Sequence, residues 1–225
     1  MLPPEVMGGI FLHMNTTIFT IGYAGFTVGE FVDELAAHGV SAVIDVRSVP
    51  FSHHDPEYDS PNISRSLMEK NIRYESYANE FGARQQDRRF YAHAGYMDFE
   101  IFAESGQFRD GVNKVLAGMN DYVFAFMCAE KNPINCHRAV LVARAFHELG
   151  IRVIHIMPDV DDITHDELEN MLLEKYCPER VNELMFTSDW LCEAYRRCNT
   201  KIGWRLENND SVHDRLHQEN SGTIL

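Results

Sequence analysis

The segment CAEKNPINCHR gathers two of the chain's five cysteines, a glutamate, a histidine and an arginine within a short stretch. Cys128 ends an apolar run, and Cys136 opens a segment with helical spacing. A cysteine at a helix N-terminus beside His137 and Arg138 should have a lowered pKa, and hence more thiolate at neutral pH. The same N-terminus can hold a phosphate, sulfate or carboxylate, with Arg138 as a bidentate clamp. These residues therefore predict thiol chemistry on a small anionic substrate.

Four short apolar segments are predicted to be the strands that hold this segment in place: residues 17–23, 41–47, 122–128 and 152–158. Each is rich in β-branched or aromatic residues and lacks clean polar alternation, which is typical of strands covered on both faces. Helical spacing follows the first strand, where Thr27 is a capping residue with Glu30 three positions on, and recurs at residues 137–149. This alternation predicts an α/β fold: a mainly parallel sheet with helices on both faces, in Rossmann-like or rhodanese-like layering, plus a C-terminal helical extension.

The middle third of the chain is less regular than the rest. Ser60 and the proline after it have the pattern of an N-cap with proline in the first helical turn, which predicts a helix ending near Lys70. Residues 72–77 have the composition of a short edge strand. A helix is expected over residues 98–119, with a break near Gly106.

The chain changes character after Pro158, where two segments with helical spacing follow each other, residues 162–176 and 181–198. The polar residues near the C-terminus are expected to be mobile, like the first residues of the chain. The sequence therefore divides into a core domain, a helical extension packed on that core, and two flexible tails, at residues 15–158, 159–205, 1–14 and 206–225.

Polar residues gather at the ends of the predicted strands, which contribute glycine, acid, base, thiol and imidazole. In open parallel sheets, ligands bind beyond the carboxyl ends of the strands, because the loops there meet helix N-termini with free N–H groups. We therefore predict catalytic roles for five residues: Cys128, Cys136, His137, Glu130 and Asp45. Roles in binding a substrate or anion are predicted for five more: Arg138, Arg47, Gly22, Tyr23 and His155.

Ordinary structural roles compete with several of these predictions. Cys128 can be a small buried hydrophobe, which is the commonest role of a free cysteine. Asp45 and Arg47 can pair with each other, and Glu130 can pair with a neighbouring cation. A histidine inside an apolar strand, such as His155, is more often a hydrogen-bonded core residue than a catalyst. The remaining cysteines are expected to be packing residues: Cys177, Cys192 and Cys198.

Zinc is the one metal that these side chains suggest, and the spacing disfavours it. Cysteine and histidine are suitable zinc ligands. However, the pattern C-x7-C-H lacks the close cysteine pair of structural zinc sites, and adjacent Cys136 and His137 are strained as ligands of one ion. We therefore predict no cofactor. A redox pair of Cys128 and Cys136 stays open as an alternative, since a tightly folded loop would let them form a sensor disulfide.

Arginines and aromatic residues alternate in residues 81–97, FGARQQDRRFYAHAGYM. Such a segment can form a lid over a nucleotide or a single strand, with rings that stack on bases and arginines that contact phosphate. The arginines concerned are Arg84, Arg88 and Arg89. The segment can equally be a loop whose arginines neutralise an acidic surface, which the net charge of -14 favours.

Composition narrows the class of protein. The net charge of -14 argues against sequence-independent binding of nucleic acid, because attraction to phosphate dominates that affinity. No apolar run approaches the roughly 20 residues of a membrane helix, and the first residues lack the pattern of a secretory signal. Five cysteines at irregular spacing argue against a disulfide framework. The sequence therefore predicts a cytoplasmic protein without a membrane or nucleic-acid partner, and leaves its oligomeric state open.

The order of strand-end cysteine, turn and helix resembles the anion-binding loops of phosphatase-like and rhodanese-like domains. The loop is longer than theirs, with Cys128 and Arg138 ten residues apart, and it lacks their glycines. A fuller resemblance is to the bacterial and archaeal family named Domain of Unknown Function 488. It is carried by TIGYAGFTVGEFVDEL, IDVRSVPFS, CAEKNPINCHR and VIHI, and covers about residues 17–157. The resemblance implies a cytoplasmic α/β domain with a site around these residues, and no particular reaction.

Taken together, the residues favour a thiol-dependent enzyme, a transferase or hydrolase, that acts on a small anionic or nucleotide-like substrate. The nucleophile would be Cys136 or Cys128, and Arg138 would hold the anion. The acid–base partner would be one of three residues: Glu130, Asp45 or His137. The alternative is a non-catalytic module that uses the same pocket to bind a nucleotide or an anion, or to sense thiol redox state.

Overall fold

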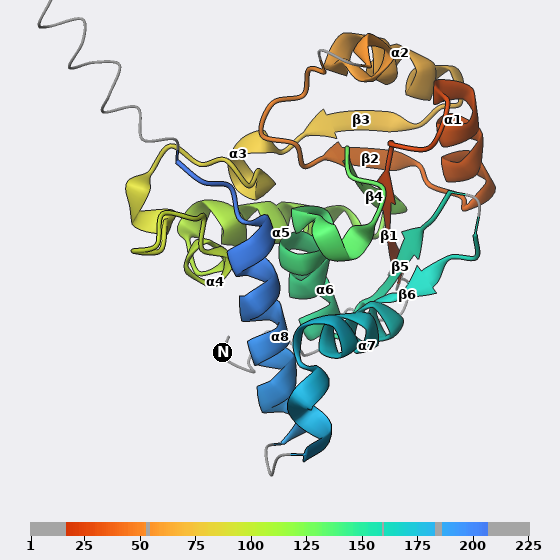
Figure 1. Cartoon of the computed structure of the whole chain (residues 1–225). Helices are drawn as coiled ribbons and strands as arrows, with labels where there is room; N and C mark the ends of the chain where they lie inside the picture. Colours follow the sequence, from red (N-terminus) through yellow and green to blue (C-terminus); the bar gives the residue numbers. More distant parts are fainter. Residues whose placement is uncertain (1–16, 53–54, 159, 183–185, 207–225) are drawn as a thin grey trace, which may run out of the picture.

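The computed structural model describes residues 17–52, 55–158, 160–182 and 186–206 (Figure 1). The predicted tail at residues 1–14 lies outside them, and so does the predicted tail at residues 206–225 apart from Leu206. The described chain forms one six-stranded sheet with helices packed on both faces. The predicted α/β class is therefore confirmed.

The sheet has the order β3-β2-β4-β1-β5-β6, and every neighbouring pair is parallel except β5 with β6. All four predicted strands are present, and so is the predicted edge strand, β3. The sixth strand was not predicted, because two residues carry no periodic pattern. The strands are β1 (Thr17–Gly22), β2 (Ala42–Asp45), β3 (Arg73–Ser76), β4 (Phe124–Cys128), β5 (Arg152–Ile156) and β6 (Ile163–Thr164).

Two helices cover one face of the sheet (Figure 1), α1 (Val28–Ala37) and α2 (Ser60–Glu69). The capping box that the sequence predicts is present at the start of α1, where Thr27 and Glu30 satisfy each other's backbone N–H groups. α2 differs from the prediction by one residue, since Asp59 occupies the N-cap position and Ser60 is already helical. Apolar side chains of both helices pack on β1, β2 and β4.

The other face carries the remaining helices and the larger hydrophobic cluster. The predicted break within residues 98–119 is confirmed, because Ser105 caps a new helix after α4 has ended. The segment after β4 begins as a π-helix, Arg138–Ala143, and continues as α6 (Arg144–Glu148). The other helices of this face are α3 (Ala78–Phe81), α4 (Phe99–Ala103), α5 (Gly106–Gly118), α7 (His165–Tyr176) and α8 (Thr187–Ile202). Short 3₁₀ turns lie at Pro56–Tyr58, Arg88–Phe90, Pro133–Asn135 and Pro178–Asn182.

The C-terminal helices α7 and α8 pack against the sheet core. Leu168 and Leu172 of α7 and Ala194 of α8 are buried in the same cluster as Phe126 of β4. Burying apolar side chains in a shared cluster stabilises both partners, because it removes their surface from water. The extension is therefore held to the core by the hydrophobic effect.

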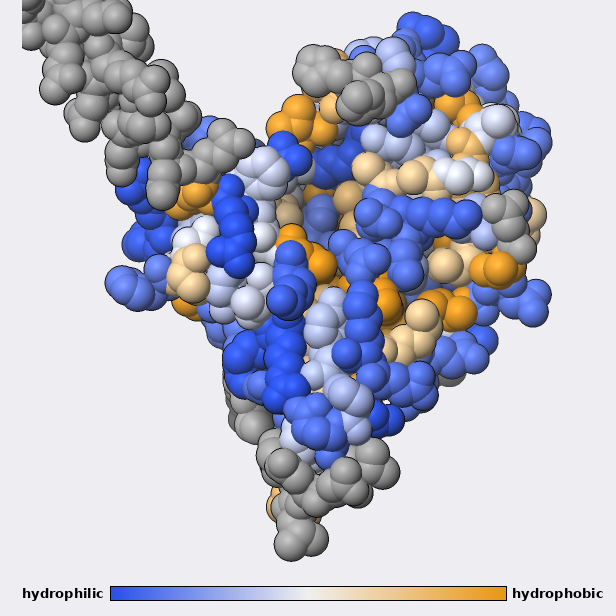
Figure 2. All heavy atoms as spheres, viewed as in Figure 1, coloured by the Kyte–Doolittle hydropathy of each residue, from blue (hydrophilic) through white to orange (hydrophobic). Residues whose placement is uncertain are grey.

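Among the described residues, none of the helices is both long enough and apolar enough to span a bilayer. On the face seen in Figure 2, hydrophobic residues lie scattered among hydrophilic ones. Two of the exposed apolar side chains, Val49 and Phe51, lie on the loop after β2 and line the pocket described below.

The chain leaves two neighbouring strands toward opposite faces of the sheet. After β1 it runs to α1 on one face, and after β4 it runs to the π-helix on the other. Since β1 and β4 are paired in parallel, the loops that follow Gly22 and Cys128 diverge from each other. Parallel sheets form their ligand crevices where neighbouring connections diverge in this way.

Candidate functional site

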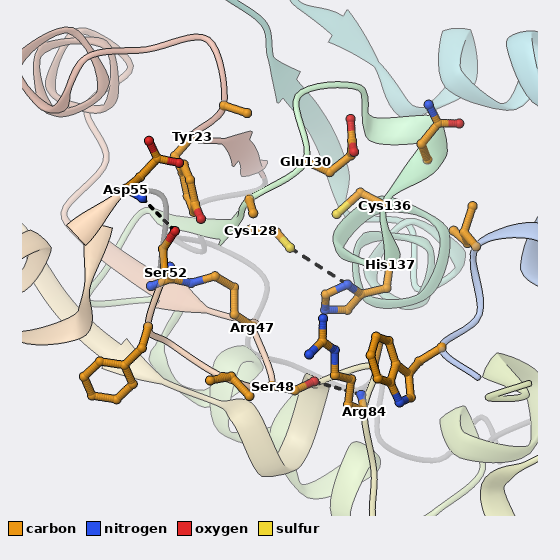
Figure 3. Close-up of a pocket in the computed structure, with 18 residues that line it drawn as sticks. Tyr23, Arg47, Ser48, Ser52, Asp55, Arg84, Cys128, Glu130, Cys136 and His137 are labelled. Carbon is orange, nitrogen blue, oxygen red and sulfur yellow. Dashed lines mark hydrogen bonds between the residues drawn. The ribbon is translucent and has the colours of Figure 1, made fainter. Parts of the chain in front are cut away.

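A pocket of about 740 Å³ opens at this point, beyond the carboxyl ends of β1, β2 and β4 (Figure 3). Two segments distant in sequence complete its wall, the loop after α3 and the chain around the end of α8. Most of the predicted site residues line this pocket: Tyr23, Arg47, Cys128, Glu130, Cys136 and His137. Three others lie just outside the lining and contact it, namely Gly22, Asp45 and Arg138. His155 lies elsewhere.

Two thiols and an imidazole lie together on the pocket wall. The Sγ atoms of Cys128 and Cys136 and a ring nitrogen of His137 all lie within 4.8 Å of one another. Both cysteines are free thiols and are buried, with 7% and 3% of their surface exposed. The local sequence explains why Cys136 comes close to Cys128. The Asn132 side chain accepts from the N–H of Ile134 at the start of a 3₁₀ turn, and this turn folds the loop back over the end of β4.

His137 has one orientation, and its contacts fix which ring nitrogen carries the proton. Nε2 lies 2.8 Å from the carbonyl oxygen of Val46. Because a carbonyl can only accept, Nε2 is the protonated nitrogen of the neutral ring, and Nδ1 keeps its lone pair. Nδ1 lies 3.9 Å from Sγ of Cys128. The imidazole is therefore arranged to take a proton from a thiol, and the Val46 carbonyl orients it.

The two thiols do not ionise alike. Burial raises the pKa of the Cys136 thiol, but the hydrogen bond from Cys128, the Arg138 charge and the adjacent imidazole outweigh it and hold that pKa well below its usual value. The same hydrogen bond, together with burial, raises the pKa of the Cys128 thiol. A thiolate is therefore favoured on Cys136 over Cys128. The Cys128 proton lies between two acceptors, the Cys136 sulfur and Nδ1 of His137.

Arg138 is fully buried behind the pocket, and its contacts differ from the predicted ones. Its Nη1 donates to the carbonyl oxygen of Glu130, and its Nη2 donates to that of Lys131 at 3.1 Å. Neither of these acceptors is a carboxylate: among the described residues, Asp45 pairs with Arg47, and the Glu130 carboxylate accepts from the N–H of Asn132. The guanidinium therefore clamps the loop through its backbone, and its positive charge helps to lower the pKa of the Cys136 thiol.

Gly22 and Glu130 shape this clamp. A Cβ at Gly22 would lie 1.8 Å from the carbonyl oxygen of Glu130 and 2.9 Å from Nη1 of Arg138, so only glycine fits. The Glu130 carboxylate is exposed and accepts from the N–H of Asn132 at 3.1 Å. Gly22 thus permits the close approach of the loop, and Glu130 contributes to the clamp through its main chain.

Asp45 and Arg47 form a buried ion pair beneath the pocket. Oδ2 of Asp45 lies 2.6 Å from Nη2 of Arg47 and 2.7 Å from the Tyr74 hydroxyl, and Oδ1 accepts from the backbone N–H and Nε of Arg47. Both carboxylate oxygens of Asp45 therefore already accept hydrogen bonds from protein groups. Arg47 is 6% exposed, lies against the Tyr23 ring, and has a buried Nη1 without a hydrogen-bond partner. An orphan guanidinium N–H in a pocket wall is suited to a bound anion.

One arginine of the aromatic-rich segment reaches the pocket. The Arg84 guanidinium lies over the Trp204 ring, 3.7 Å from its centroid, and both side chains line the pocket. The backbone N–H of Arg84 donates to the Ser48 hydroxyl at 2.8 Å, which ties the segment to the loop after β2. Arg88 and Arg89 do not line the pocket. The segment therefore contributes one cation and one aromatic contact to the site.

His155 belongs to a chain of buried polar groups away from the pocket. Tyr195 donates to the Glu169 carboxylate at 2.9 Å, so the Tyr195 oxygen accepts from Nε2 of His165 at 2.9 Å. Nδ1 of His165 then accepts from Nε2 of His155 at 3.1 Å, and Nδ1 of His155 accepts from Thr20 at 2.8 Å. Burial lowers the pKa of both histidines, that of His165 to about 3. Every member of the chain has a partner.

Two sets of described side chains have positions suited to a metal ion. The first is the thiol–imidazole cluster, whose soft ligands fit Zn²⁺ and whose histidine donates its other N–H to a carbonyl, as metal-bound histidines usually do. The folded loop thus brings the three ligand atoms together although seven residues separate the two cysteines in the sequence. The second set joins α6 to α7 and consists of His147, Asp166 and Glu169.

Two contributors were not foreseen from the sequence. Tyr74 donates to the buried Asp45 carboxylate from the edge strand, and the parallel pairing of β3 with β2 is the signal that would have found it. Trp204 comes to the pocket from beyond α8, and no local pattern marks it. Contacts between remote segments depend on how the extension packs, which periodicity does not reveal.

Comparison with known proteins places the chain in a family. Residues 27–145 match the family described as "Domain of unknown function DUF488". The match covers more than half of the chain and includes both pocket cysteines, so the chain belongs to the DUF488 family. No curated protein and no solved structure matches it.

Proposed function

We propose that this member of the DUF488 family is a thiol-dependent enzyme that acts on a small anionic substrate in the pocket beyond β1 and β4. The observation that carries the proposal is the mutual reach of Cys136, Cys128 and His137 on the pocket wall. A thiolate at neutral pH is a strong nucleophile, and an oriented base beside it can move protons during the reaction.

Each member of the cluster receives a distinct role. Cys136 is the nucleophile, because its pKa is lowered and it begins the helical segment after β4, where its carbonyl accepts from the N–H groups of Ala139 and Val140. Cys128 keeps its proton and hydrogen-bonds to the thiolate. His137 accepts and returns protons through Nδ1. Arg138 is a positioning residue, which holds the loop and stabilises the thiolate from behind.

Arg47 and Arg84 are proposed to hold the anionic part of the substrate. Arg47 offers the buried Nη1 that lacks an acceptor, and Arg84 offers an exposed guanidinium whose stacking on Trp204 limits its freedom. Two acidic residues, Asp55 and Glu130, also line the pocket and disfavour a highly charged ligand. The pocket therefore suits a small anion attached to a less polar body, and the aromatic lining leaves a nucleotide-like body among the candidates.

The test compares thiols within one chain. Cys192 is exposed and lies outside the pocket, so it serves as an internal standard for alkylation by iodoacetamide at pH 7. Peptide mass spectrometry should show Cys136 labelled faster than Cys192 despite its burial, and millimolar sulfate or phosphate should slow the labelling of Cys136 alone. Replacing Arg47 by lysine should weaken that protection. Labelling of Cys136 no faster than Cys192 would leave the pocket as a binding module without a nucleophile.

A further inference from the structure

We infer that Cys128 is a second reactive thiol, which resolves a mixed disulfide formed on Cys136, so that the chain reduces small anionic disulfides. The inference rests on the proposed function and deepens it by naming the substrate class. It starts from a feature that one nucleophile does not explain, the presence of a second free thiol within 4.8 Å of the first on the same pocket wall.

The other buried cysteines show what a merely structural thiol looks like in this chain. Cys177 donates to the carbonyl oxygen of Trp190 at 3.8 Å, and Cys198 donates to that of Ile134 at 3.2 Å. Neither lines the pocket. Cys128 instead lies 3.9 Å from an imidazole nitrogen that has a free lone pair. Its surroundings are those of a thiol that can be deprotonated when needed, rather than those of a packing residue.

The first step uses the existing thiolate. The Cys136 sulfur attacks one sulfur of a substrate disulfide, RS–SR. The S–S bond of the substrate breaks, a Cys136–SR mixed disulfide forms, and one RS⁻ leaves and takes a proton from water. Once Cys136 is part of the mixed disulfide, its sulfur no longer carries the negative charge that accepts the Cys128 proton, and Nδ1 of His137, 3.9 Å from the Cys128 sulfur, is the acceptor that remains in the cluster.

The second step uses the neighbouring base. Nδ1 of His137 takes the Cys128 proton, and the resulting thiolate attacks the Cys136 sulfur. The mixed disulfide breaks, the second RS⁻ leaves with the proton returned by His137, and a Cys128–Cys136 disulfide remains. Two electrons have passed from the protein dithiol to the substrate disulfide. A small dithiol reductant restores the two thiols by the same exchange.

The cations of the pocket select the charge of the substrate. Arg47 and Arg84 line the same pocket as the thiols, and the buried Nη1 of Arg47 has no acceptor. A disulfide whose R groups carry carboxylates would supply that acceptor, whereas one whose R groups are amines would be repelled. The reaction rates with disulfides of opposite charge therefore test the inferred binding mode.

Oxidised glutathione, which carries carboxylates, and cystamine, which is cationic, are suitable probes of the reduced full-length chain. With oxidised glutathione, we expect the parent to release two thiols per chain and to form a Cys128–Cys136 disulfide detectable by mass spectrometry. Cys128→Ser should release one thiol and accumulate glutathione on Cys136, and Cys136→Ser should release none. The control Cys192→Ser should match the parent.

Cystamine should react at least about tenfold more slowly than oxidised glutathione, because of its charge.

Separate outcomes identify which idea has failed. If Cys136 outpaces Cys192 with iodoacetamide but Cys128→Ser releases the second thiol as fast as the parent, the resolving role is wrong and the proposed nucleophile stands. If Cys136 is unreactive, the proposed function fails together with the inference. One tightly held zinc ion per chain in the purified protein, protecting both cysteines until a chelator removes it, would also overturn the inference, since the thiols would then be ligands. Circular dichroism of each variant confirms that the fold is retained.

Discussion

Two groups of buried polar residues lie on either side of β1, and they differ in what their hydrogen bonds leave free. Beside β4, the thiol cluster faces a pocket, and behind it Arg138 has only backbone carbonyls as acceptors. Beside β5, the chain from Thr20 to Glu169 runs through two histidines and a tyrosine, and each donor finds an acceptor. The first group can change its protonation and contacts, whereas the second is already satisfied.

The comparison shows how a site differs from a structural network with similar residues. Cys128 and His155 look alike in the sequence, because both are reactive residues on predicted strands of one parallel sheet. Burial alone does not separate them either, since both are buried. What separates them is that His155 uses both ring nitrogens inside the protein, while the cysteines line a pocket together with Arg47, whose buried Nη1 has no hydrogen-bond partner.

Removing Arg138 is expected to give the largest effect on stability. Arg138→Ala leaves the carbonyl groups of Glu130 and Lys131 without their donor and creates a cavity behind the pocket. The cost should be about 3–5 kcal/mol in the free energy of unfolding. Urea unfolding measures it, with Arg89→Ala as the control, because Arg89 is exposed and should cost less than about 1 kcal/mol. Arg138→Lys should recover part of the loss. Equal stability of the two alanine variants would contradict the clamp.

Acid should destabilise the protein through the histidine chain. Burial lowers the folded-state pKa of His165 to about 3, and that of His155 is also well below its usual value, while both are near 6.5 when unfolded. Below about pH 6.5 the unfolded chain binds protons that the folded chain does not. Stability is therefore greatest above about pH 6.5 and falls as the pH decreases. Each unfolded histidine goes from half to almost fully protonated between pH 6.5 and 5.5, which should cost about 1 kcal/mol per histidine and hence about 2 kcal/mol for the two. Urea titrations at these two pH values test this, and a flat profile would contradict neutral buried histidines.

A pair of substitutions tests the thiol cluster and the histidine chain separately. Tyr195→Phe removes the acceptor of His165 Nε2 and should cost about 1–3 kcal/mol in unfolding free energy, with no change in the alkylation rate of Cys136. Cys136→Ser should do the opposite, with a change in stability below about 1 kcal/mol and loss of reactivity toward disulfides. Thermal unfolding and thiol labelling of both variants provide the two readouts. A change in Cys136 labelling in Tyr195→Phe would mean that the groups are coupled.

Arg84 should give the smallest effect. Its guanidinium is exposed and stacks on Trp204, so Arg84→Ala should leave the unfolding free energy within about 0.5 kcal/mol of the parent. The affinity for sulfate or phosphate, measured by protection of Cys136 from alkylation, should fall about fivefold, the equivalent of about 1 kcal/mol. Arg88→Ala is the matched control, because Arg88 does not line the pocket. Identical protection in both variants would remove Arg84 from the anion site.

Much of the fold was predictable, because the pattern that encodes it is local. Short apolar runs identified β1, β2, β4 and β5, and capping residues identified α1 and the break between α4 and α5. The convergence of Gly22, Arg47 and Cys128 also followed, since a parallel sheet brings its carboxyl ends to one edge.

The roles inside the site were less predictable, because they depend on side-chain partners. Arg138 was expected to meet an anion or a carboxylate, but it holds the backbone of its own loop. Asp45 was a candidate acid–base residue, and its oxygens are taken up by Arg47 and Tyr74. Trp204 reaches the pocket only because the C-terminal extension packs back on the core, a contact that no sequence window contains.

The central claim is that the pocket holds a Cys136 thiolate at neutral pH, and the pH dependence of alkylation tests it most directly. The rate constant for iodoacetamide labelling of Cys136, followed by mass spectrometry from pH 5 to 10 with Cys192 as the internal standard, reports the fraction of thiolate. We predict that Cys136 reaches half of its maximal rate well below the ordinary thiol pKa of about 8.5, and that Cys128 becomes reactive only at higher pH. Half-maximal labelling of Cys136 at or above about 8.5 would contradict the account.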